Sequence, residues 1–517
     1  MATISPVAHS PDPQAEVVAF LQHGDAFGKG AAPRRIDTHA ASIFLTGDSA
    51  WKLKRAVRFG YLDFSTADRR HDALDAELHL NRRTAPLLYR AVHPVTRAAN
   101  GRLTIGGSGE VVDWLLEMRR FPDGALLDQH ADRGPLDARL MMRLAEQIVA
   151  FHAEAEIGSS GGGAARFRAV VEGSIASMAD FPGILDTERT QGAGARLLDL
   201  ATQLAPLLDA RGRAGRIRHG HGDLHLANIA LIDDEPILFD CLEFSTDLAT
   251  IDVLYDLAFL LMDLWHRALR TEANIVFNRY LDLSPMEEGG IALLPLFLSV
   301  RATIRAHVLA ARSLRADGDK AAARNARTYL DLAQALVVPV PPRLIAIGGL
   351  SGTGKSSLAR LLGGDIGRAP GARIFRSDVL RKRLAGLPPE VSLPRESYSQ
   401  EAAARVYQAS NEMASTALAS GQAVIVDAVF AQPAERRKIE AVAARAHQPF
   451  TGLWLEAPIE TRLARVASRR ADASDADIAV AHAQAALPIG DMGDWHRVSA
   501  AGTLADVAAA ARHALAR

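Results

Sequence analysis

Apolar and polar residues alternate in blocks along the chain, and the blocks predict two differently built parts. In the second part, short apolar runs are separated by longer helical stretches, the pattern of a parallel sheet with helices on both faces. The runs that we predict as strands are Leu344–Ile347, Arg373–Arg376, Ala423–Val426, Gly452–Leu455 and His496–Ser499. This part is therefore predicted to have an α/β fold.

The first part has a different order of elements. Short strands are predicted at Ser42–Leu45 and Ala50–Lys54, joined by a turn at Gly47-Asp48, and a long helix follows over Ala67–Arg83. From about residue 135 the pattern is mostly helical. Further predicted strands are Leu87–Ala91, Val111–Met118 and a hairpin of Ile229–Ile232 with Pro236–Phe239. We therefore expect an α+β fold in this part.

A proline-rich segment separates the two parts. Val337–Arg343 contains three prolines, which cannot continue the preceding helical pattern. We predict an N-terminal tail with a first helix over residues 1–30, a first domain over 31–336, a linker over 337–342 and a second domain over 343–517.

Composition excludes several classes of protein. The 59 Lys and Arg residues nearly cancel the 60 Asp and Glu residues, which argues against a dedicated nucleic-acid binder. The single cysteine, Cys241, rules out a disulfide within the chain and a cysteine-based zinc site. The N-terminus does not read as a signal peptide, and no apolar run reaches the roughly 18 residues of a membrane span. We expect a cytoplasmic protein without nucleic-acid or membrane partners; the sequence does not indicate its oligomeric state.

Residues 349–356 read GLSGTGKS, which fits the phosphate-binding pattern G-x-x-x-x-G-K-[ST]. The motif follows a predicted strand and precedes an apolar helix, which is the context it requires. Its glycines allow backbone N–H groups to surround phosphate oxygens, and the helix start adds a positive dipole. We expect Lys355 to bridge the β- and γ-phosphates of ATP in catalysis and Ser356 to ligate Mg²⁺. The residues predicted to bind the nucleotide are Gly349, Leu350, Ser351, Gly352, Thr353, Gly354, Lys355, Ser356 and Ser357.

Two acids follow predicted strands of the parallel sheet, at the edge where ligands bind. Asp378 comes after Arg373–Arg376, and Asp427 after Ala423–Val426. A carboxylate in this place can hold Mg²⁺ or take a proton from an attacking hydroxyl. We predict Asp427 as a metal ligand. Asp378 is predicted as a catalytic residue, with capping of the next helix as an equal alternative.

The segments FRSDVLRKRLAG and VIVDAVF resemble small P-loop kinases of the gluconate kinase, polynucleotide kinase and zeta-toxin type. The resemblance covers most of residues 344–517. It implies that Asp378 activates the acceptor hydroxyl and that lid arginines close over the phosphates. The lid candidates are Arg462, Arg465, Arg469 and Arg470, for which a solvated basic helix face is the alternative.

In the first part, residues 219–228 read HGHGDLHLAN, and Asp240 follows twelve residues beyond Asn228. The set formed by Asp223, Asn228 and Asp240 provides a carboxylate for the hydroxyl proton and oxygen ligands for Mg²⁺, as phosphoryl transfer requires. The histidines of this string do not have the spacing of a helical zinc pair, so we expect them to brace the loop. They are His219, His221 and His225.

HGDLHLAN and the downstream FDCLEF resemble the aminoglycoside phosphotransferase/choline kinase-like family, which shares the protein-kinase fold. The resemblance implies Asp223 as the catalytic base and Asn228 and Asp240 as metal ligands. The segments WKLKR, FGYLDFST and ELHLNRR also look like a bacterial subgroup in which this domain is fused to a P-loop kinase. The resemblance therefore extends over nearly the whole chain.

Protein-kinase-like folds pair a strand lysine with a helix glutamate. Lys52 and Lys54 lie on the same face of their predicted strand, and we favour Lys52 because it lies deeper in the strand, with Glu77 as its partner. A solvated pair of surface lysines is the alternative. The chain departs from protein kinases at Asp240-Cys241-Leu242, where they have Asp-Phe-Gly, and only Gly47 stands in for a glycine-rich loop.

These patterns predict an ATP- and Mg²⁺-dependent phosphotransferase with two nucleotide sites, acting on a hydroxyl of a small molecule. The alternative is a nucleotide-binding regulator, in which one domain binds ATP without turnover and controls the other domain or a partner. A toxin-like kinase that acts on a cell-wall sugar nucleotide through the second domain alone is a third possibility.

Overall fold

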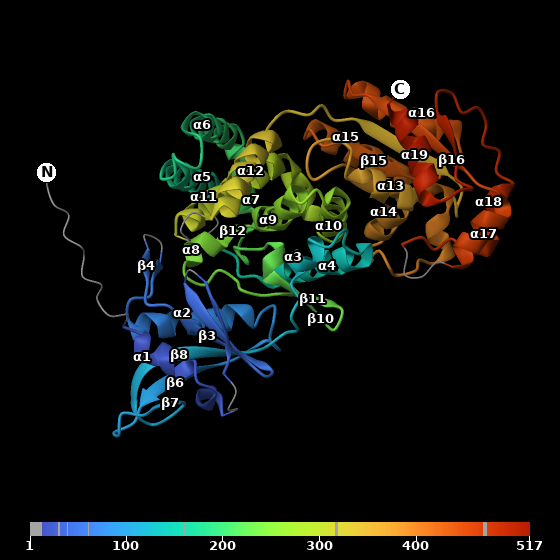
Figure 1. The fold of residues 1–517 in the computed structure, drawn as a ribbon. Helices are drawn as coiled ribbons and strands as arrows, with labels where there is room; N and C mark the ends of the chain where they lie inside the picture. The colour runs from blue at the N-terminus through green and yellow to red at the C-terminus, as the bar shows by residue number, and fades with distance from the viewer. Residues whose placement is uncertain are drawn as a thin grey trace. The chain divides into compact units, whose positions relative to one another are not determined.

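The computed structural model describes residues 13–28, 32–38, 40–59, 62–158, 161–315, 319–468 and 473–516 (Figure 1). The chain forms two compact units. The first unit consists of Met1–Gly134 and Arg218–Ile251, and the second of Pro135–Ile217 and Asp252–Arg517. The predicted linker at 337–342 therefore lies within the second unit, so the boundary between the compact units differs from the predicted domain boundary.

The first unit is built on a six-stranded antiparallel sheet with the order β1-β2-β3-β8-β6-β7. A two-residue turn, Gly47-Asp48, joins β2 to β3 as predicted. The strands are β1 (Arg34–Asp37), β2 (Ala41–Thr46), β3 (Ser49–Lys54), β6 (Tyr89–Arg97), β7 (Leu103–Ile105) and β8 (Glu110–Arg119).

Helices cover both faces of this sheet. Side chains along each strand alternate between the faces, so the strands present apolar residues on both, and each face needs a helix to bury them. Leu53 of β3 packs in a cluster with Leu21 of α1 (Ala15–Leu21). Leu116 of β8 packs on the other face with Leu74 of α2 (Ala67–Asn81). Lys52 lies opposite Leu116 in the register, which directs this lysine toward α2.

Shorter elements complete the first unit. The predicted hairpin is present as β10 (Ile229–Ile232) and β11 (Glu235–Leu238), and its two turn residues, Asp233 and Asp234, both have positive φ. The others are η1 (Gly24–Phe27), β4 (Arg58–Phe59), β5 (Leu62–Asp63), α3 (Leu127–Ala131), η2 (Leu226–Asn228) and α8 (Thr246–Ala249). β9 (Ile217–His219) and β12 (Thr250–Asp252) lie where the chain passes between the units.

The second unit begins with a helical part. Its elements are α4 (Ala138–Glu154), α5 (Gly163–Ala179), α6 (Thr187–Gln203), α7 (Ala205–Arg213), α9 (Val253–His266), α10 (Arg270–Leu283), η3 (Pro285–Leu293), α11 (Leu294–Arg315) and α12 (Lys320–Leu336). Within the described ranges, one helical stretch, Pro285–Leu314, has the length and composition of a membrane span, and 67% of its most apolar window is buried. It packs here as a core helix.

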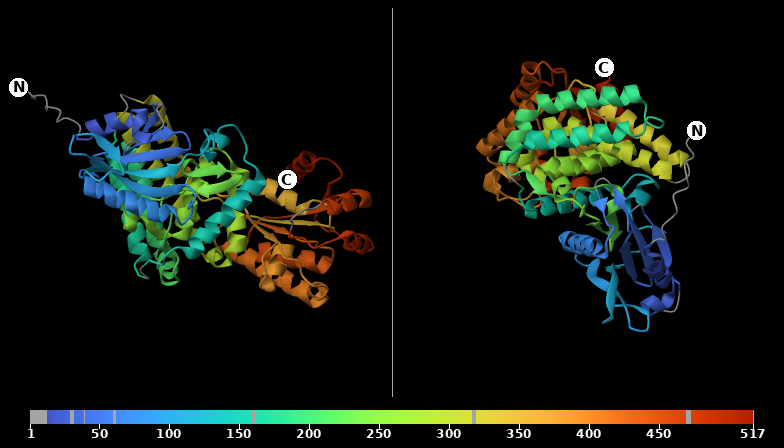
Figure 2. Two further views of the ribbon diagram at one scale, coloured as in Figure 1. Left: turned by 90° about the horizontal axis from the view of Figure 1, so that it is seen from below. Right: turned by 90° about the vertical axis from the view of Figure 1, so that its left-hand side faces the viewer.

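The rest of the second unit is a five-stranded parallel sheet with the order β14-β15-β13-β16-β17 (Figure 2). All five predicted strands are observed, with their ends shifted by at most two residues. They are β13 (Leu344–Gly349), β14 (Arg373–Arg376), β15 (Val424–Asp427), β16 (Phe450–Glu456) and β17 (His496–Ser499).

Both faces of the parallel sheet are buried by helices. One apolar core includes α13 (Lys355–Gly363) and α19 (Leu504–Leu515), and the opposite core includes α14 (Ser377–Leu384), α15 (Gln400–Ala419) and α16 (Pro433–Arg445). The remaining elements are η4 (Arg395–Tyr398), α17 (Ile459–Ala467) and α18 (Ile478–Ala485). The predicted α/β class is therefore confirmed.

Helix α10 packs against β14, the edge strand of the parallel sheet. Asn278 Oδ1 accepts a hydrogen bond from the amide of Ile374 at 2.7 Å, and its Nδ2 donates to the carbonyl of Ala372 at 3.0 Å. Arg373 has no exposed side-chain area and pairs with Asp282 at 2.8 Å and Glu288 at 2.7 Å. The helical part and the parallel sheet are thus joined by polar bonds to the backbone of an edge strand.

Candidate functional sites

The phosphate-binding motif connects β13 to α13 and lies at the carboxyl end of the central part of the sheet. Three of its glycines have positive φ, at 143° for Gly349, 86° for Gly352 and 91° for Gly354. A Cβ on Gly352 would lie 2.5 Å from the carbonyl oxygen of Arg462, so a larger residue does not fit there. The sequence motif therefore adopts the loop conformation that it predicts.

Asp427 lies beside the motif because β15 pairs in parallel with β13, with Asp427 in register with Ile347. Ser356 Oγ donates to Asp427 Oδ2 at 2.5 Å, and Arg376 Nε lies 3.7 Å from the same oxygen. A hydroxyl and a carboxylate held together in this way are oxygen donors of the kind that Mg²⁺ takes, so the pair fits the predicted metal site.

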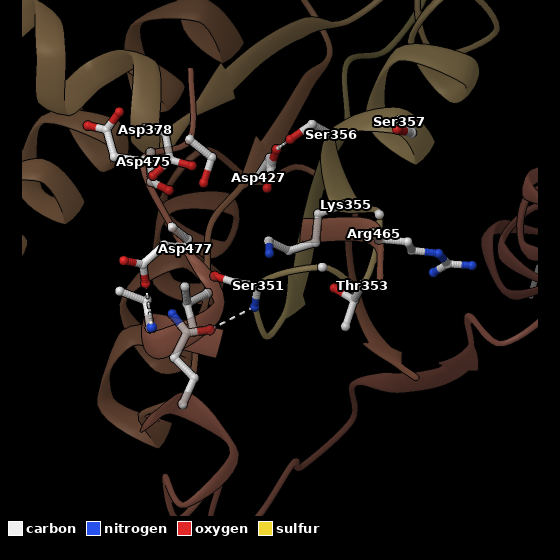
Figure 3. A pocket seen from close by; sticks show the side chains of 18 of the residues that line it. Ser351, Thr353, Lys355, Ser356, Ser357, Asp378, Asp427, Arg465, Asp475 and Asp477 are labelled. Carbon is white, nitrogen blue, oxygen red and sulfur yellow. Dashed lines mark hydrogen bonds between the residues drawn. The ribbon is translucent and has the colours of Figure 1, made fainter. Parts of the chain in front are cut away.

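The motif opens into a cavity of about 1090 Å³ (Figure 3). Lys355 extends into it beside Ser356 and Asp427. Asp378 and Asp475 lie on one side of Lys355, and Arg465 lies on the other. The volume lies near the upper end of the range of about 300–1,000 Å³ that is usual for small-molecule sites, so the cavity is large enough for a nucleotide.

Asp378 lies in the first turn of α14, whose N-cap is Arg376, so Asp378 does not occupy the capping position. Burial raises its pKa, and Arg376 only partly offsets this effect while Asp427 adds to it. A carboxylate with a raised pKa in a cavity is suited to accept a proton.

The predicted lid arginines occupy different environments. Arg462 is buried, donates to the carbonyl of Ala481 at 3.0 Å and does not line the cavity. Arg465 does line the cavity and donates to the carbonyl of Gly502 at 3.4 Å. Arg469 and Arg470 lie outside the described residues. Of the two described lid candidates, only Arg465 therefore lines the cavity.

Two cavity groups were not anticipated from the sequence. The side-chain oxygen of Gln484 accepts a hydrogen bond from the amide of Ser351 at 2.7 Å. Asp475 Oδ2 accepts from Tyr398 at 2.5 Å, and its Oδ1 pairs with Lys382 at 3.0 Å. The acid-rich run at 472–477 is a sequence signal for Asp475, whereas Gln484 has none.

The first unit brings its own predicted site residues together. Lys52 Nζ lies 2.6 Å from Glu77 Oε1 and 2.8 Å from Asp240 Oδ1. Lys54 Nζ lies 2.6 Å from Glu77 Oε2 and also contacts Glu243. Both lysines thus share one face, as predicted. Lys52 lies inside β3, as predicted, and Lys54 is its last residue; the side chain of Lys54 is nevertheless the more buried of the two, at 3% exposed against 12% for Lys52.

The pKa values in this site follow from its alternating charges. Burial lowers the pKa of Lys52, but Asp240 and Glu77 outweigh burial and hold the pKa well above its ordinary value. Burial likewise raises the pKa of Asp240, and Lys52 reverses the shift, so the pKa lies below the ordinary range. Lys52 and Asp240 are therefore both charged at neutral pH.

The 219–228 loop holds Asp223 against Asn228. Asn228 Nδ2 donates to Asp223 Oδ2 and to the Asp223 carbonyl, both at 2.9 Å. His225 Nε2 lies 3.4 Å from Asp223 Oδ2, and His221 Nε2 lies 3.0 Å from the carbonyl oxygen of Phe239. The described residues contain no group of three or more His, Cys, Asp or Glu side chains suited to a metal ion. The loop contacts of His221 and His225 agree with the predicted bracing role.

The backbone at Asp240 and Cys241 is fixed by hydrogen bonds to β6 and to α2, the helix that carries Glu77. Asp240 has a positive φ of 61°, and its amide donates to the Tyr89 hydroxyl at 3.1 Å. The amide of Cys241 donates to Oδ1 of Asn81, the last residue of α2, at 2.9 Å. Asn228 and Asp240 offer the oxygen donors that Mg²⁺ takes. This unit therefore has the lysine–glutamate pair and the loop carboxylates of a protein-kinase-like fold.

Comparisons with known proteins find matches over both parts of the chain. Residues 344–487 match a family described as "AAA domain". An uncharacterized protein of Mycobacterium tuberculosis is 29% identical over 479 residues, covering 90% of this chain and 92% of the relative.

Solved structures that match include kinases of both expected kinds. A gluconokinase from Sinorhizobium meliloti is 22% identical with a TM-score of 0.26, covering 34% of this chain and 93% of its own. An ethanolamine kinase from Plasmodium vivax is 12% identical with a TM-score of 0.39, covering 59% of this chain and 82% of its own. At these scores, the two fold assignments rest on the sheets and site geometry of this chain itself.

Proposed function

We propose that this protein is an ATP-dependent phosphotransferase with two nucleotide sites, one in each unit, that transfers the γ-phosphate to a hydroxyl of a small molecule. The observation that carries the proposal is the cavity of the second unit, where the phosphate-binding loop, the Ser356–Asp427 pair and Asp378 face one space (Figure 3). This is the set of groups that phosphoryl transfer requires.

In the second unit, the loop amides and Lys355 hold the phosphates of ATP. Ser356 and Asp427 would hold Mg²⁺, which neutralises phosphate charge when bound. Asp378 accepts the proton of the acceptor hydroxyl. The acceptor oxygen then forms its bond to the γ-phosphorus as the bond from that phosphorus to the bridging oxygen of ADP breaks. The raised pKa of Asp378 makes its carboxylate a better proton acceptor than an ordinary aspartate.

In the first unit, Lys52 holds the α- and β-phosphates and Glu77 orients Lys52. Asp223 accepts the acceptor proton, and Asn228 and Asp240 would hold Mg²⁺. The proposal keeps residues 31–336 and 343–517 as the two phosphotransferase domains. It also keeps the expectations of a cytoplasmic location and of no nucleic-acid or membrane partner.

One observation favours the alternative of a regulator for the first unit. The turn between β2 and β3 has only two residues, Gly47 and Asp48, and therefore provides no glycine-rich loop to cover phosphates. Under this alternative, the first unit binds ATP without turnover and controls the second unit or a partner.

The proposal is tested by measuring ATP consumption and product formation with a panel of sugars, amino alcohols, aminoglycosides and nucleosides. Lys355→Ala disables the second site and Asp223→Asn the first, and an exposed change, Lys438→Met, serves as the control. An acceptor of the second site should lose at least about 100-fold in turnover with Lys355→Ala and keep it with Asp223→Asn. An acceptor of the first site should show the reverse.

Three outcomes decide between the two functions. If Lys355→Ala abolishes turnover of one acceptor and Asp223→Asn abolishes turnover of another, both sites are working. ATP binding to both units with turnover only at the second supports the regulator. ATP binding without phosphorylation of any acceptor contradicts the phosphotransferase.

A further inference from the structure

Five charged side chains form one continuous cluster in the first unit, in which acids and bases alternate. The order of contacts is Asp240, Lys52, Glu77, Lys54, Glu243. We call this set the charge cluster. It joins β3, α2 and the segment after β11, and it contains three carboxylates and two ammonium groups. The segments WKLKR, ELHLNRR and FDCLEF supply all five members.

The proposed function uses only Asp240, Lys52 and Glu77 and assigns no role to Lys54 and Glu243. Both are largely buried, with side chains 3% and 10% exposed, although Lys and Glu are seldom buried unless paired. A buried ion pair contributes little net stability, because desolvation offsets most of the attraction. A role other than stability is therefore needed to account for this pair.

Geometry indicates that role. Glu77 is fully buried and each of its two oxygens contacts a different lysine, both at 2.6 Å. The Lys52 contact is a hydrogen bond, whereas the Lys54 contact is an ion pair without hydrogen-bond geometry, and rotation of the carboxylate would lengthen both. The ammonium of Lys54 is itself fixed, by Glu243 and by the ring of Phe64 at 5.2 Å. Glu77 therefore keeps its place without depending on Lys52.

We propose that Lys54 and Glu243 are positioning residues for the nucleotide site of the first unit. They hold Glu77 so that Lys52 can exchange Asp240 for the nucleotide phosphates and still keep its glutamate partner. The inference rests on the proposed function, because it requires ATP to bind at Lys52.

The charge balance gives the proposal a specific signature. Loss of Lys54 alone leaves three carboxylates against one ammonium, which disfavours a polyanionic triphosphate. Loss of both Lys54 and Glu243 returns the cluster to its original net charge. The double variant should therefore bind ATP more tightly than the single Lys54 variant.

The experiment measures ATP affinity by calorimetric titration in a Lys355→Ala background, where the site of the second unit is disabled. Lys54→Met is expected to weaken ATP binding at least about tenfold, and Lys54→Met with Glu243→Gln to recover most of that loss. Lys54→Arg, which keeps the charge but changes the shape of the head group, should lose less affinity than Lys54→Met. Lys438→Met, an exposed lysine on α16, is the matched control and should change nothing.

A second readout does not depend on nucleotide. Acylation of lysines, read by mass spectrometry, compares Lys52 in the parent and in Glu243→Gln. Without Glu243, Lys54 is fixed less firmly and so is Glu77, which loosens the contact of Glu77 with Lys52; labelling of Lys52 should rise about threefold or more. This variant also decides the matter if Lys54→Met does not fold.

The failures can be told apart. If the Lys355→Ala parent binds no ATP, the proposed first site is contradicted and the inference with it. If the parent binds ATP, but Lys54→Met lowers only the melting temperature and leaves affinity and Lys52 labelling unchanged, the pair is merely structural and the inference alone is overturned.

Discussion

The partial burial of Asp378 favours its proposed role as a proton acceptor but reduces the stability of the folded protein. Burial raises its pKa, which improves it as a proton acceptor but makes its charged form costly. Because the pKa is higher in the folded than in the unfolded protein, the contribution of Asp378 to stability is present below the unfolded pKa of about 3.9 and is lost as pH rises through the folded pKa. At neutral pH the charged carboxylate therefore destabilises the fold.

Asp378→Asn should lower turnover at the second site by about 10²–10⁴-fold and raise the melting temperature at pH 7, with a smaller gain at low pH. The acid limb of the wild-type pH–rate profile should lie above that of an ordinary aspartate and disappear in the variant. Steady-state kinetics and thermal melts at several pH values check both effects. Wild-type turnover in this variant would remove Asp378 from proton transfer.

How far single residues could be predicted depended on whether their partners were near in sequence. Lys355 and Ser356 follow from a local motif, and Glu77 follows from a helix after a lysine-bearing strand. The contact between Lys54 and Glu243 spans 189 residues, and no local pattern indicates it. Arg462, a lid candidate, is buried instead, with its backbone next to Gly352, and no pattern near it in the sequence indicates this contact.

At the scale of elements, β14 is held by side chains of a helix outside the parallel sheet. Arg373 lies on this strand, and its ion-pair partners Asp282 and Glu288 lie in the segment that contains α10 and η3. Removing one member of a buried ion pair leaves the others uncompensated, which costs much more than the pair contributes. The same strand leads into α14, where Asp378 lies.

Arg373→Met should therefore lower the free energy of unfolding by about 3–5 kcal/mol. Arg512→Met breaks a half-exposed pair with Asp365 and should cost only about 0–1 kcal/mol. Denaturant titrations of the two variants check the difference. Equal costs would show that the α10–β14 contact is not a stabilising junction.

Elements with strong apolar patterns could be predicted, and those without could not. The buried strands of the parallel sheet are runs of apolar residues and were found almost to the residue. β1 reads RRID and is mostly exposed, so its strand structure comes only from pairing with β2. β6 runs from Tyr89 to Arg97 instead of Leu87–Ala91, because its pairing with β8 extends it through Pro94.

At the scale of the whole molecule, the predicted linker does not separate two independent bodies. Asn274 and Asn278 of α10 bond to backbone groups of residues 370–374, so the edge of the parallel sheet is covered from outside the predicted second domain. An uncovered edge strand is a template for pairing with other chains. The helical part thus covers an edge strand of the parallel sheet, although the predicted boundary near residue 340 assigns the two to different domains.

A fragment of residues 343–517 should consequently melt at a lower temperature than the parallel-sheet part of the full chain and should aggregate more readily. Calorimetry of the fragment and the full chain, with light scattering, measures both effects. Asn278→Ala in the full chain should move its melting temperature part of the way toward that of the fragment. A fragment that stays monomeric and melts as the full chain does would contradict this account.

The amide of Ser351 in the phosphate-binding loop already donates a hydrogen bond to Gln484, so a nucleotide phosphate must compete with Gln484 for this amide. A phosphate that takes this amide does not gain a new bond; it replaces one that the chain already makes. The measured affinity for ATP then depends on how much more strongly the phosphate binds this amide than Gln484 does. Gln484 is part of the chain and competes at a fixed effective concentration. Substitutions around α18 can therefore tune ATP binding in either direction without touching ATP.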